Sequence, residues 1–372
     1  MKSKKKTLVN QAYKLKVGIN KFFRSLSPRV STDKTIKIKI VAIAKDEASY
    51  LPEWIFHHLY FGFDTISIYV NNTTDNTAEL KAAFQDNTQI NWYCGDKYFQ
   101  QSSKSAQIAI YEHELKLSRS QKYSHVMFLD IDEFWTPLNL DCKVKDFIQS
   151  HSQADVFCFE WFNRTNEEFP FMPAISERLK GYCGHHVKSI VSTNQQYERI
   201  NPHVAISANA NYIFADGTKY VFNLSEAGRV SKKQQWAPLK AVFILHRMLR
   251  SEEEYLAILS RGRPYTQPEK SSIFKNNRDG YLSNKGDVSH NFPKEELNHY
   301  CKERELFYQF YQLHEIINKA HAHVAIKKLE LIELIKNSPI EEVDTLKKIL
   351  KEVTSPEVHQ AYLAFKQRHN II

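Results

Sequence analysis

The stretch that decides the fold is Phe128–Trp135, which reads FLDIDEFW. The apolar run Val126–Leu129 predicts a short buried strand, and Asp130, Asp132 and Glu133 follow it directly. In open α/β sheets, ligands bind at the carboxyl ends of the strands, so these acids stand where a binding site is expected. Three neighbouring carboxylates repel one another, and a divalent cation, Mg²⁺ or Mn²⁺, is the simplest compensation. For a D-x-D pattern taken alone, a solvated acidic turn is the alternative.

Strand and helix patterns alternate upstream of this stretch. Thr35–Ala44 changes from alternating to continuously apolar, which is typical of a strand that starts at an edge and ends buried. Ser49 can cap a helix that reaches Gly62, and Thr65–Val70 reads as a second strand. Further elements are predicted near residues 77–84 (helix), 90–93 (strand) and 103–119 (helix). This alternation predicts a mixed, mostly parallel α/β sheet flanked by helices.

Further strands are predicted beyond residue 150, and the C-terminal part is mostly helical. The strands are expected at residues 155–162, 188–192 and 241–245. Ser251–Glu254 has the pattern of a capping box that opens a helix, and apolar residues recur at helical spacing from Lys294 onward. The sequence therefore predicts three parts: an arm at residues 1–34, a catalytic-size domain at 35–290 and a helical extension at 291–372.

The composition is that of a globular protein, with 42% hydrophobic and 25% charged residues. No segment approaches the ~20 consecutive apolar residues needed to cross a bilayer, and the N-terminus lacks the apolar stretch of a secretory signal. We therefore expect the protein in the cytoplasm. The five cysteines lie far apart with no C-x-x-C pair, so neither a zinc cage nor a disulfide framework is indicated.

Basic residues are concentrated at the N-terminus. Residues 1–34 carry ten Lys or Arg and one acid, which accounts for the whole net charge of +9. Because the rest of the chain is neutral, a nucleic-acid-binding face is not favoured. Apolar residues interleave with the lysines at roughly helical spacing, which favours binding to an anionic membrane surface, and we expect a peripheral position on the inner face of the membrane. A solvated tail is the alternative.

Polar residues follow the first two predicted strands. Asp46 and Glu47 come just after the first strand, and Asn72 and Asp75 just after the second. Carboxylates and amides at strand ends are suited to hydrogen bonds with ribose hydroxyls and a base edge. Neither G-x-G-x-x-G nor G-x-x-x-x-G-K-[ST] occurs, so the phosphates of a bound nucleotide would need a metal and basic side chains. Ordinary helix caps and turns are the alternative interpretation of these four residues.

Several blocks of the sequence, in this order along the chain, resemble the glycosyltransferases of the family-2-like and family-92-like group. The first blocks are Val41–His58, Gly62-Phe63-Asp64, Ile68–Asp75 and Phe128–Phe134. The later blocks are Glu177-Arg178, Lys188–Val191, Asn201-Pro202-His203, Leu245-His246, Ser251–Glu254 and Arg261-Gly262. The resemblance covers about residues 37–263. It implies a GT-A fold, followed here by the helical C-terminal extension.

The resemblance also implies an activity and roles for individual residues. The activity is transfer of a sugar, with inversion and with Mn²⁺ or Mg²⁺, from a nucleotide diphosphate donor, most simply a UDP-sugar. The acceptor is expected to be a glycan or glycolipid of cell-surface polysaccharide or lipopolysaccharide synthesis. Asp130 and Asp132 would hold the metal and contact the donor, and His246 would complete the metal site. Lys188 and Arg261 would neutralise the diphosphate, while Asp46, Glu47 and Asp75 would line the nucleoside pocket.

Inversion needs a base for the acceptor hydroxyl, and Glu160 and Glu177 are the candidates. The sequence departs from the family pattern at Asn163, where glycine is expected, and at Arg247, where tyrosine is expected.

Two rival functions stay open: another nucleotide enzyme on a similar sheet, either a nucleotide-sugar hydrolase or a nucleotidyltransferase, and a basic nucleic-acid-binding protein.

Two pairs of adjacent histidines, His57-His58 and His185-His186, raise the question of a zinc site. Neighbouring side chains on a strand point to opposite faces, and on a helix they diverge by about 100°. A structural or solvent-facing role is therefore favoured over zinc binding for both pairs.

Overall fold

The computed structural model describes residues 36–101, 105–165, 167–221, 228–230, 239–262, 272–283 and 285–371. The arm predicted to bind membranes, residues 1–34, lies outside this part of the chain. None of the described helices has the length and apolar character needed to cross a bilayer.

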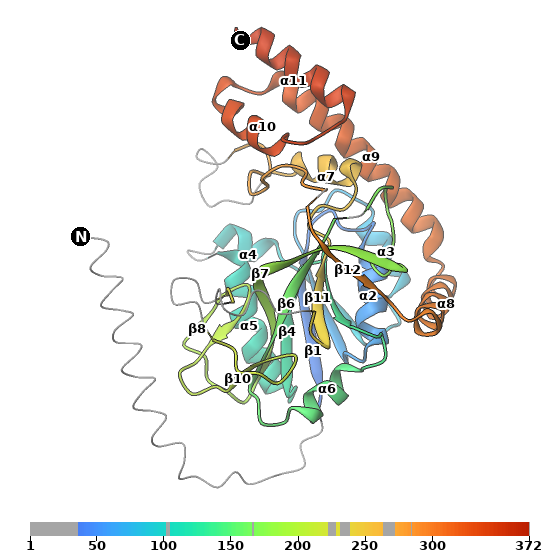
Figure 1. The fold of residues 1–372 in the computed structure, drawn as a ribbon, viewed down its shortest axis with the longest axis vertical. Coiled ribbons are helices and arrows are strands. Elements are labelled where there is room, and N and C mark those ends of the chain that lie inside the picture. Colours follow the sequence, from blue (N-terminus) through green and yellow to red (C-terminus); the bar gives the residue numbers. More distant parts are fainter. Residues whose placement is uncertain are drawn as a thin grey trace, which may run out of the picture.

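The described residues form a ten-stranded mixed sheet at the centre of the molecule (Figure 1). Its main order is β3-β2-β1-β4-β7-β6-β11-β5, with β10 beside β6 and β12 beside β7. The strands of this sheet are β1 (Ile38–Ala44), β2 (Thr65–Val70), β3 (Ile90–Cys94), β4 (His125–Phe128), β5 (Glu133–Pro137), β6 (Val156–Arg164), β7 (Arg178–Ser192), β10 (Tyr212–Phe214), β11 (Val242–His246) and β12 (Val288–Asn291). A separate pair consists of β8 (Arg199–Ile200) and β9 (Ala205–Ile206).

Parallel pairing brings three predicted strand ends to one edge of the sheet. Strand β1 pairs in parallel with β2, with Ala44 opposite Val70, and in parallel with β4, with Val41 opposite Phe128. Because parallel strands point the same way, the polar segments that follow β1, β2 and β4 emerge at the same edge. The mixed, mostly parallel α/β sheet that the sequence predicts is confirmed.

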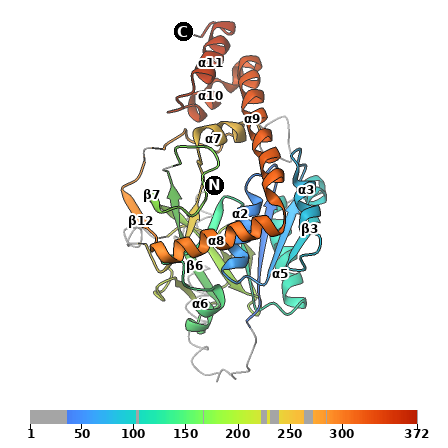
Figure 2. The same cartoon turned by 90° about the vertical axis from the view of Figure 1, so that its right-hand side faces the viewer.

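Helices cover both faces of the sheet (Figures 1 and 2). The helices are α2 (Leu51–Tyr60), α3 (Thr77–Ala83), α4 (Asp96–Gln101), α5 (Ala106–Ser120), α6 (Val144–Ser150), α7 (Glu252–Leu259), α8 (Lys294–Phe310), α9 (Leu313–Asn337), α10 (Val343–Ile349) and α11 (Pro356–Arg368). Apolar residues of α2, α3, α6 and α8 pack into one core, and those of α5 pack into a second core on the other face. The site described below lies at the edge of this layered core.

Local sequence explains where several of these helices begin. Pro52 stands in the first turn of α2, where its missing N–H costs no hydrogen bond. Helix α7 opens with the predicted capping box, because the Ser251 side chain accepts from the Glu254 backbone and the Glu254 side chain accepts from the Ser251 backbone. His57 and His58 of α2 are buried and bonded to backbone carbonyls of Trp135 and Trp54, which confirms the structural role predicted for this pair.

The C-terminal helices belong to a third core. Tyr255 and Leu256 of α7 pack in one apolar cluster with Leu331 and Ile335 of α9 and with residues of α10 and α11. Helix α9 runs from α8, which lies against the sheet domain, up to α10 and α11 (Figure 2). This third core therefore draws on both sides of residue 290, the boundary suggested by the sequence.

Candidate functional site

The acidic stretch forms a fixed turn between β4 and β5. Glu133 begins β5, where it pairs with His246 of the antiparallel strand β11. The indole nitrogen of Trp54, from α2, donates to the backbone carbonyl oxygens of Asp130 at 3.1 Å and of Glu133 at 2.9 Å. These two bonds hold the turn against α2 and fix the directions in which the acidic side chains leave it.

Lys188 of β7 neutralises one side of the acidic turn. Its Nζ lies 2.9 Å from Asp130 Oδ2 and 2.9 Å from Glu133 Oε2. Glu133 Oε2 also accepts from the Asp130 backbone N–H. Burial, together with the neighbouring Asp130 and Asp132 carboxylates, raises the pKa of Glu133 to about 8 against the opposing charge of Lys188. The same two acids, Asp130 and Glu133, keep the pKa of Lys188 high although burial opposes it.

Asp132 and His246 face each other on the other side of the turn. Asp132 Oδ2 lies 3.6 Å from His246 Nε2 and 3.8 Å from a guanidinium nitrogen of Arg278. Burial raises the pKa of Asp132, but the nearby charges of His246, Arg250 and Arg278 outweigh it and hold that pKa well below its ordinary value. Asp132 is therefore an ionised carboxylate directly beside an imidazole.

Asn163 sets the orientation of that imidazole. Its Oδ1 accepts from His246 Nδ1 at 2.8 Å, so the ring is held with its Nε2 directed at Asp132. Asn163 is one of the two departures from the family pattern. A Cβ added to the neighbouring Gly184 would lie 2.7 Å from the Asn163 amide nitrogen, so a glycine here leaves room for the amide.

The Asp132–His246 pair suits a divalent cation as a partial ligand set. Among the described residues, no cluster of three or more His, Cys, Asp or Glu side chains forms a complete metal site. Mg²⁺ commonly takes only one or two protein carboxylates and completes its shell with water and substrate phosphate. One carboxylate and one oriented imidazole nitrogen are compatible with that mode of binding.

Trp161 of β6 adjoins this pair within a group of histidines. Its ring centroid lies 4.2 Å from that of His246, 5.1 Å from His186 and 5.3 Å from His203. The rings of His186 and His203 stack on each other at 4.6 Å. Trp161 Nε1 is buried and has no hydrogen-bond partner among the residues that the structure describes. His186, predicted to be structural or solvent-facing, thus lies within the site region.

A pocket of about 150 Å³ opens at the ends of β1 and β2. Helices α7 and α9 form its other walls. It is lined by Lys45, Asp46, Tyr50, Asn72, Thr74, Ala257, Ile258, Ser260, Arg261, His323, Val324 and Lys327. Three residues predicted to bind the nucleotide, Asp46, Asn72 and Arg261, are thereby brought to one pocket.

Two other predicted residues support the pocket wall. Asp75 accepts from the backbone N–H of Ala48 at 2.7 Å and of Thr77 at 3.0 Å, so both of its oxygens are engaged by the chain itself. Glu47 pairs with Arg261 at 2.7 Å and with Arg250 at 3.3 Å. The carboxylate of Asp46 is likewise bonded to Thr73 and Thr74, and despite burial these hydrogen bonds lower its pKa.

Four basic residues gather between the pocket and Asp132. They are Arg250, Arg261, Lys275 and Arg278, of which the sequence prediction included only Arg261. Burial and the charges of Arg261 and Arg278 lower the pKa of Lys275 to about 7. A bound anion would offset the repulsion among these positive charges, so the cluster favours anion binding at this place. The missed residues are separated in sequence, and only their repeated basic character between residues 247 and 278 could have pointed to them.

A family model for glycosyltransferase family 92 matches residues 38–237, more than half of the chain. The chain belongs to this family. A search of curated proteins gave no significant match. The glycosyltransferase fold expected from the resemblance, with its sheet flanked by helices and its helical C-terminal part, is confirmed, and so is the class of enzyme.

Solved structures similar to this glycosyltransferase include two of TarS from S. aureus and one of HddC from Yersinia pseudotuberculosis. The structure of TarS 1–349 in complex with UDP shares 14% identity over 42% of this chain and 47% of that chain, with a TM-score of 0.30. A second TarS 1–349 structure shares 10% identity over 90% of this chain and 92% of that chain, with a TM-score of 0.29. HddC shares 10% identity over 57% of this chain and 93% of that chain, with a TM-score of 0.32. The chain thus spans less than half of the UDP-bound structure's length.

The two candidate bases of this glycosyltransferase lie apart from Asp132. On β6, Phe157 and Phe159 face the first core, so strand alternation directs Glu160 to the opposite face. Its charged neighbours there are Lys240 and Asp216, and burial raises its pKa to about 7. Glu177 is exposed and precedes β7, eleven positions before Lys188. The structure does not bring either carboxylate together with Asp132 and His246.

Replacing Glu160 by glutamine is expected to stabilise the enzyme at alkaline pH. The carboxyl group has a pKa of about 7 when folded and 4.5 ordinarily, so its ionisation penalises the folded state increasingly as pH rises from about 4.5 to 7. At pH 8 the E160Q gain is about 3 kcal/mol at most, and at pH 4 it vanishes. Urea denaturation at both pH values measures this, with exposed Glu177→Gln as the control. An equal effect of E160Q at pH 4 and pH 8 would contradict the raised pKa of Glu160.

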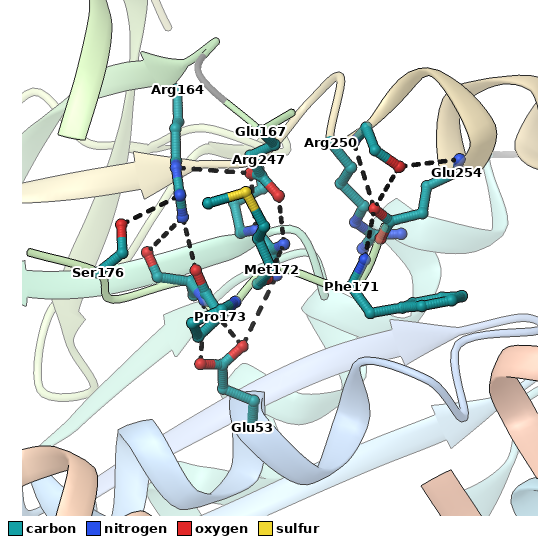
Figure 3. A network of polar contacts seen from close by, with 12 residues as sticks. Glu53, Arg164, Glu167, Phe171, Met172, Pro173, Ser176, Arg247, Arg250 and Glu254 are labelled. Carbon is teal, nitrogen blue, oxygen red and sulfur yellow. Dashed lines mark hydrogen bonds and ion pairs between the residues drawn. The ribbon is translucent and has the colours of Figure 1, made fainter. Parts of the chain in front are cut away.

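The second departure from the family pattern, Arg247, is the centre of a buried ionic network (Figure 3). Its guanidinium binds both carboxylate oxygens of Glu167, donates to the Met172 carbonyl and lies 3.7 Å from Glu53. Glu53 in turn accepts from Arg304 of α8 at 2.7 Å. The network ties α2, the loop after β6, and α8 to the residue that directly follows His246.

Proposed function

We propose that this glycosyltransferase moves a sugar from a UDP-sugar to a glycan or glycolipid acceptor, with inversion and with Mn²⁺ or Mg²⁺. The observation that carries the proposal is the succession of the pocket, the basic cluster and the Asp132–His246 pair along one sheet edge. Arg261 joins the first two, since it lines the pocket and pairs with Glu47, which also binds Arg250. Arg278 then joins the basic cluster to Asp132.

In this proposal the donor lies along that succession. Its nucleoside occupies the pocket, and its diphosphate crosses the basic residues Arg250, Arg261, Lys275 and Arg278. Departure of a nucleoside diphosphate concentrates negative charge on the phosphate oxygens, and fixed cations at that place stabilise it. Lys188 is already committed to Asp130 and Glu133, so its part is to hold the acidic turn in position.

Asp132 and His246 are the residues that we propose as metal ligands, with Asp130 close by. Mn²⁺ or Mg²⁺ bound there would act as a Lewis acid on the diphosphate oxygens. The ionised state of Asp132 and the orientation of His246 Nε2 toward it, which Asn163 fixes, support this assignment. The sugar of the donor or acceptor would then lie near Trp161, whose buried Nε1 has no partner among the described residues.

Inversion requires a base at the acceptor hydroxyl. Glu160 and Glu177 stay the candidates that sequence supplies, and a pKa near 7 suits Glu160 to the role. Its position beside Lys240 and Asp216 argues for a structural role instead. Assays of sugar transfer and of donor binding by the same E160Q variant separate the two roles, because loss of transfer with unchanged donor binding would identify Glu160 as the base.

The basic N-terminal arm, residues 1–34, supports the proposal that the reaction takes place at a membrane surface. Ten basic residues within positions 1–34 would attract the arm to anionic lipid, each contributing roughly 1 kcal/mol near the surface. We propose that the enzyme is peripheral on the inner face of the membrane and acts in cell-surface polysaccharide or lipopolysaccharide synthesis. Binding of the full chain, and not of a chain lacking residues 1–34, to vesicles with anionic lipid tests this part.

Calorimetric titration of UDP and GDP, each with and without Mn²⁺, tests the donor site. UDP is expected to bind, and Mn²⁺ is expected to strengthen its binding. Arg278→Ala removes a cation from the diphosphate path, so UDP should bind roughly tenfold more weakly, about 1.4 kcal/mol, while uridine is unaffected. Arg199→Ala, at an exposed site on β8, is the control. If a folded wild-type protein binds neither diphosphate, the proposal fails. Release of free sugar or sugar phosphate without any acceptor would favour a hydrolase.

A further inference from the structure

We propose that helix α9 of the C-terminal extension forms the nucleobase end of the donor pocket, with His323 as the residue that contacts the base. This inference rests on the proposed function, because it presupposes that a nucleotide occupies the pocket. His323 lies outside residues 38–237, the part of the chain that the family model matches. Recognition of the base would therefore depend on a segment that the family match does not include.

Helix α9 contributes a continuous surface to the pocket. His323, Val324 and Lys327 all line it. Residues four apart lie on the same face of a helix, so His323 and Lys327 face the pocket one turn from each other. Lys327 Nζ is paired with Glu330 at 2.8 Å, whereas the buried Nε2 of His323 has no hydrogen-bond partner among the described residues.

The helix is fixed to the sheet domain next to this surface. Asn76, at the start of α3, donates to the Ile316 carbonyl of α9 at 2.9 Å. The ring of His321 stacks on Phe171 with centroids 3.6 Å apart. Ala320 packs in the core of the sheet domain, and Leu331 packs in the third core against α7. The wall is therefore held from both sides.

Two buried polar atoms of the pocket residues lack partners among the described residues. They are Nε2 of His323, on α9, and the hydroxyl of Tyr50, just before α2. Buried polar groups almost always find a hydrogen-bond partner, and leaving one unpaired is costly. Two such atoms in the lining of one pocket, contributed by separate parts of the chain, indicate a ligand that supplies the partners.

The remaining lining indicates which part of the donor this is. Ala257 and Ile258 of α7, together with Val324 of α9, are apolar, and the cation Arg261 lies on the side toward Glu47 and the basic cluster. Apolar walls with a few fixed polar groups suit a flat heterocycle better than a phosphate. The base thus lies toward α7 and α9, and the diphosphate leaves toward Arg261 and Asp132.

Calorimetry on the full chain with Mn²⁺ tests the inference with UDP, CDP, GDP and inorganic diphosphate as probes. His323→Ala is expected to weaken the preferred nucleotide roughly tenfold and to reduce its advantage over the other two. Diphosphate, which has no base, should bind the variant and the wild type equally. His314→Ala, an exposed histidine of the same helix, should match the wild type for every probe.

A second variant protects the test against misfolding. His323→Gln keeps a side chain that can hydrogen-bond and should retain more of the nucleotide affinity than His323→Ala does. If the wild type binds a nucleotide and both variants bind that nucleotide as tightly as the wild type does, the inference on α9 is overturned while the proposed function stands. If the wild type binds none of the three nucleotides, the proposed function itself fails, and this inference fails with it. Equal weakening for diphosphate and nucleotide would also overturn it, because the effect would then not concern the base.

Discussion

Replacement of Asp132 by asparagine is expected to lower kcat/KM for sugar transfer by roughly 10²–10³-fold, the usual cost of removing one group that stabilises transition-state charge. Asparagine has nearly the same shape as aspartate, so the change removes the charge and leaves the turn between β4 and β5 in place. Release of UDP from a UDP-sugar in the presence of acceptor measures the rate. The dependence of that rate on Mn²⁺ concentration should shift to higher concentrations, because a proposed ligand is lost.

A matched control and a partner variant make this prediction specific. Asp141→Asn alters an exposed aspartate in the turn before α6 and should leave the rate unchanged. His246→Ala should lower the rate about as much as Asp132→Asn, and the double variant should be little worse than either one. Such non-additivity is expected when two residues act as one unit. Full activity of a folded Asp132→Asn enzyme would contradict the assignment, and thermal unfolding checks the fold.

The strands that position the site were predicted correctly from the sequence wherever an apolar run corresponds to a strand that is buried in the structure. Strands β2 and β3 lie within one residue of their predicted bounds, β1 ends at the predicted Ala44 but begins three residues later than predicted, at Ile38, and α7 opens at the predicted capping box. Strand β5 was missed because Glu133, its first residue, was interpreted only as a member of the acidic turn. The first ten residues of β7 were missed because they contain Gly181 and Gly184 and lack apolar alternation. A Cβ at Gly181 would lie 2.0 Å from the Asn163 carbonyl oxygen, so this part of the strand depends on close backbone contact.

In the candidate site, only the residues that lie at strand ends or in sequence motifs could be predicted. Asp130, Asp132 and His246 come together because each stands at or near the end of a strand in one sheet, and Lys188 reaches the acids from the interior of β7, the strand beside β4. Arg278 and His323 lie on segments whose place is set by tertiary packing against α7, so the sequence did not show that they approach the site. No role could be assigned from the sequence to Asn163 and Arg247, the two departures from the family pattern. The structure gives Asn163 a hydrogen bond to His246 and gives Arg247 the centre of a buried network.

Replacement of Arg247 by methionine is expected to destabilise the protein by about 3–5 kcal/mol, the typical cost of removing one partner from a buried ion pair. Arg247 and Glu167 are both buried, and among the described residues the ion pair that remains to Glu167 in the variant is the more distant one with Arg164, at 3.8 Å. Urea denaturation at pH 7 measures the loss. Lys336→Ala, which breaks an exposed pair with Glu333, is the control and should cause little change.

Two further measurements distinguish the ion pair from simple loss of packing. Burial raises the pKa of Glu167, but Arg247 and Arg164 outweigh it and lower that pKa below 4.5, so the pair stabilises the protein above that pH and the contribution is lost as pH falls. The deficit of Arg247→Met should therefore shrink when pH falls below about 4.5. The double variant Arg247→Met/Glu167→Met should recover much of the stability, because no uncompensated charge stays buried. If the double variant is as unstable as the single one at pH 7, packing and not charge explains the loss. Since Arg247 directly follows His246, recovered stability without recovered transfer would further indicate that the network also positions the imidazole.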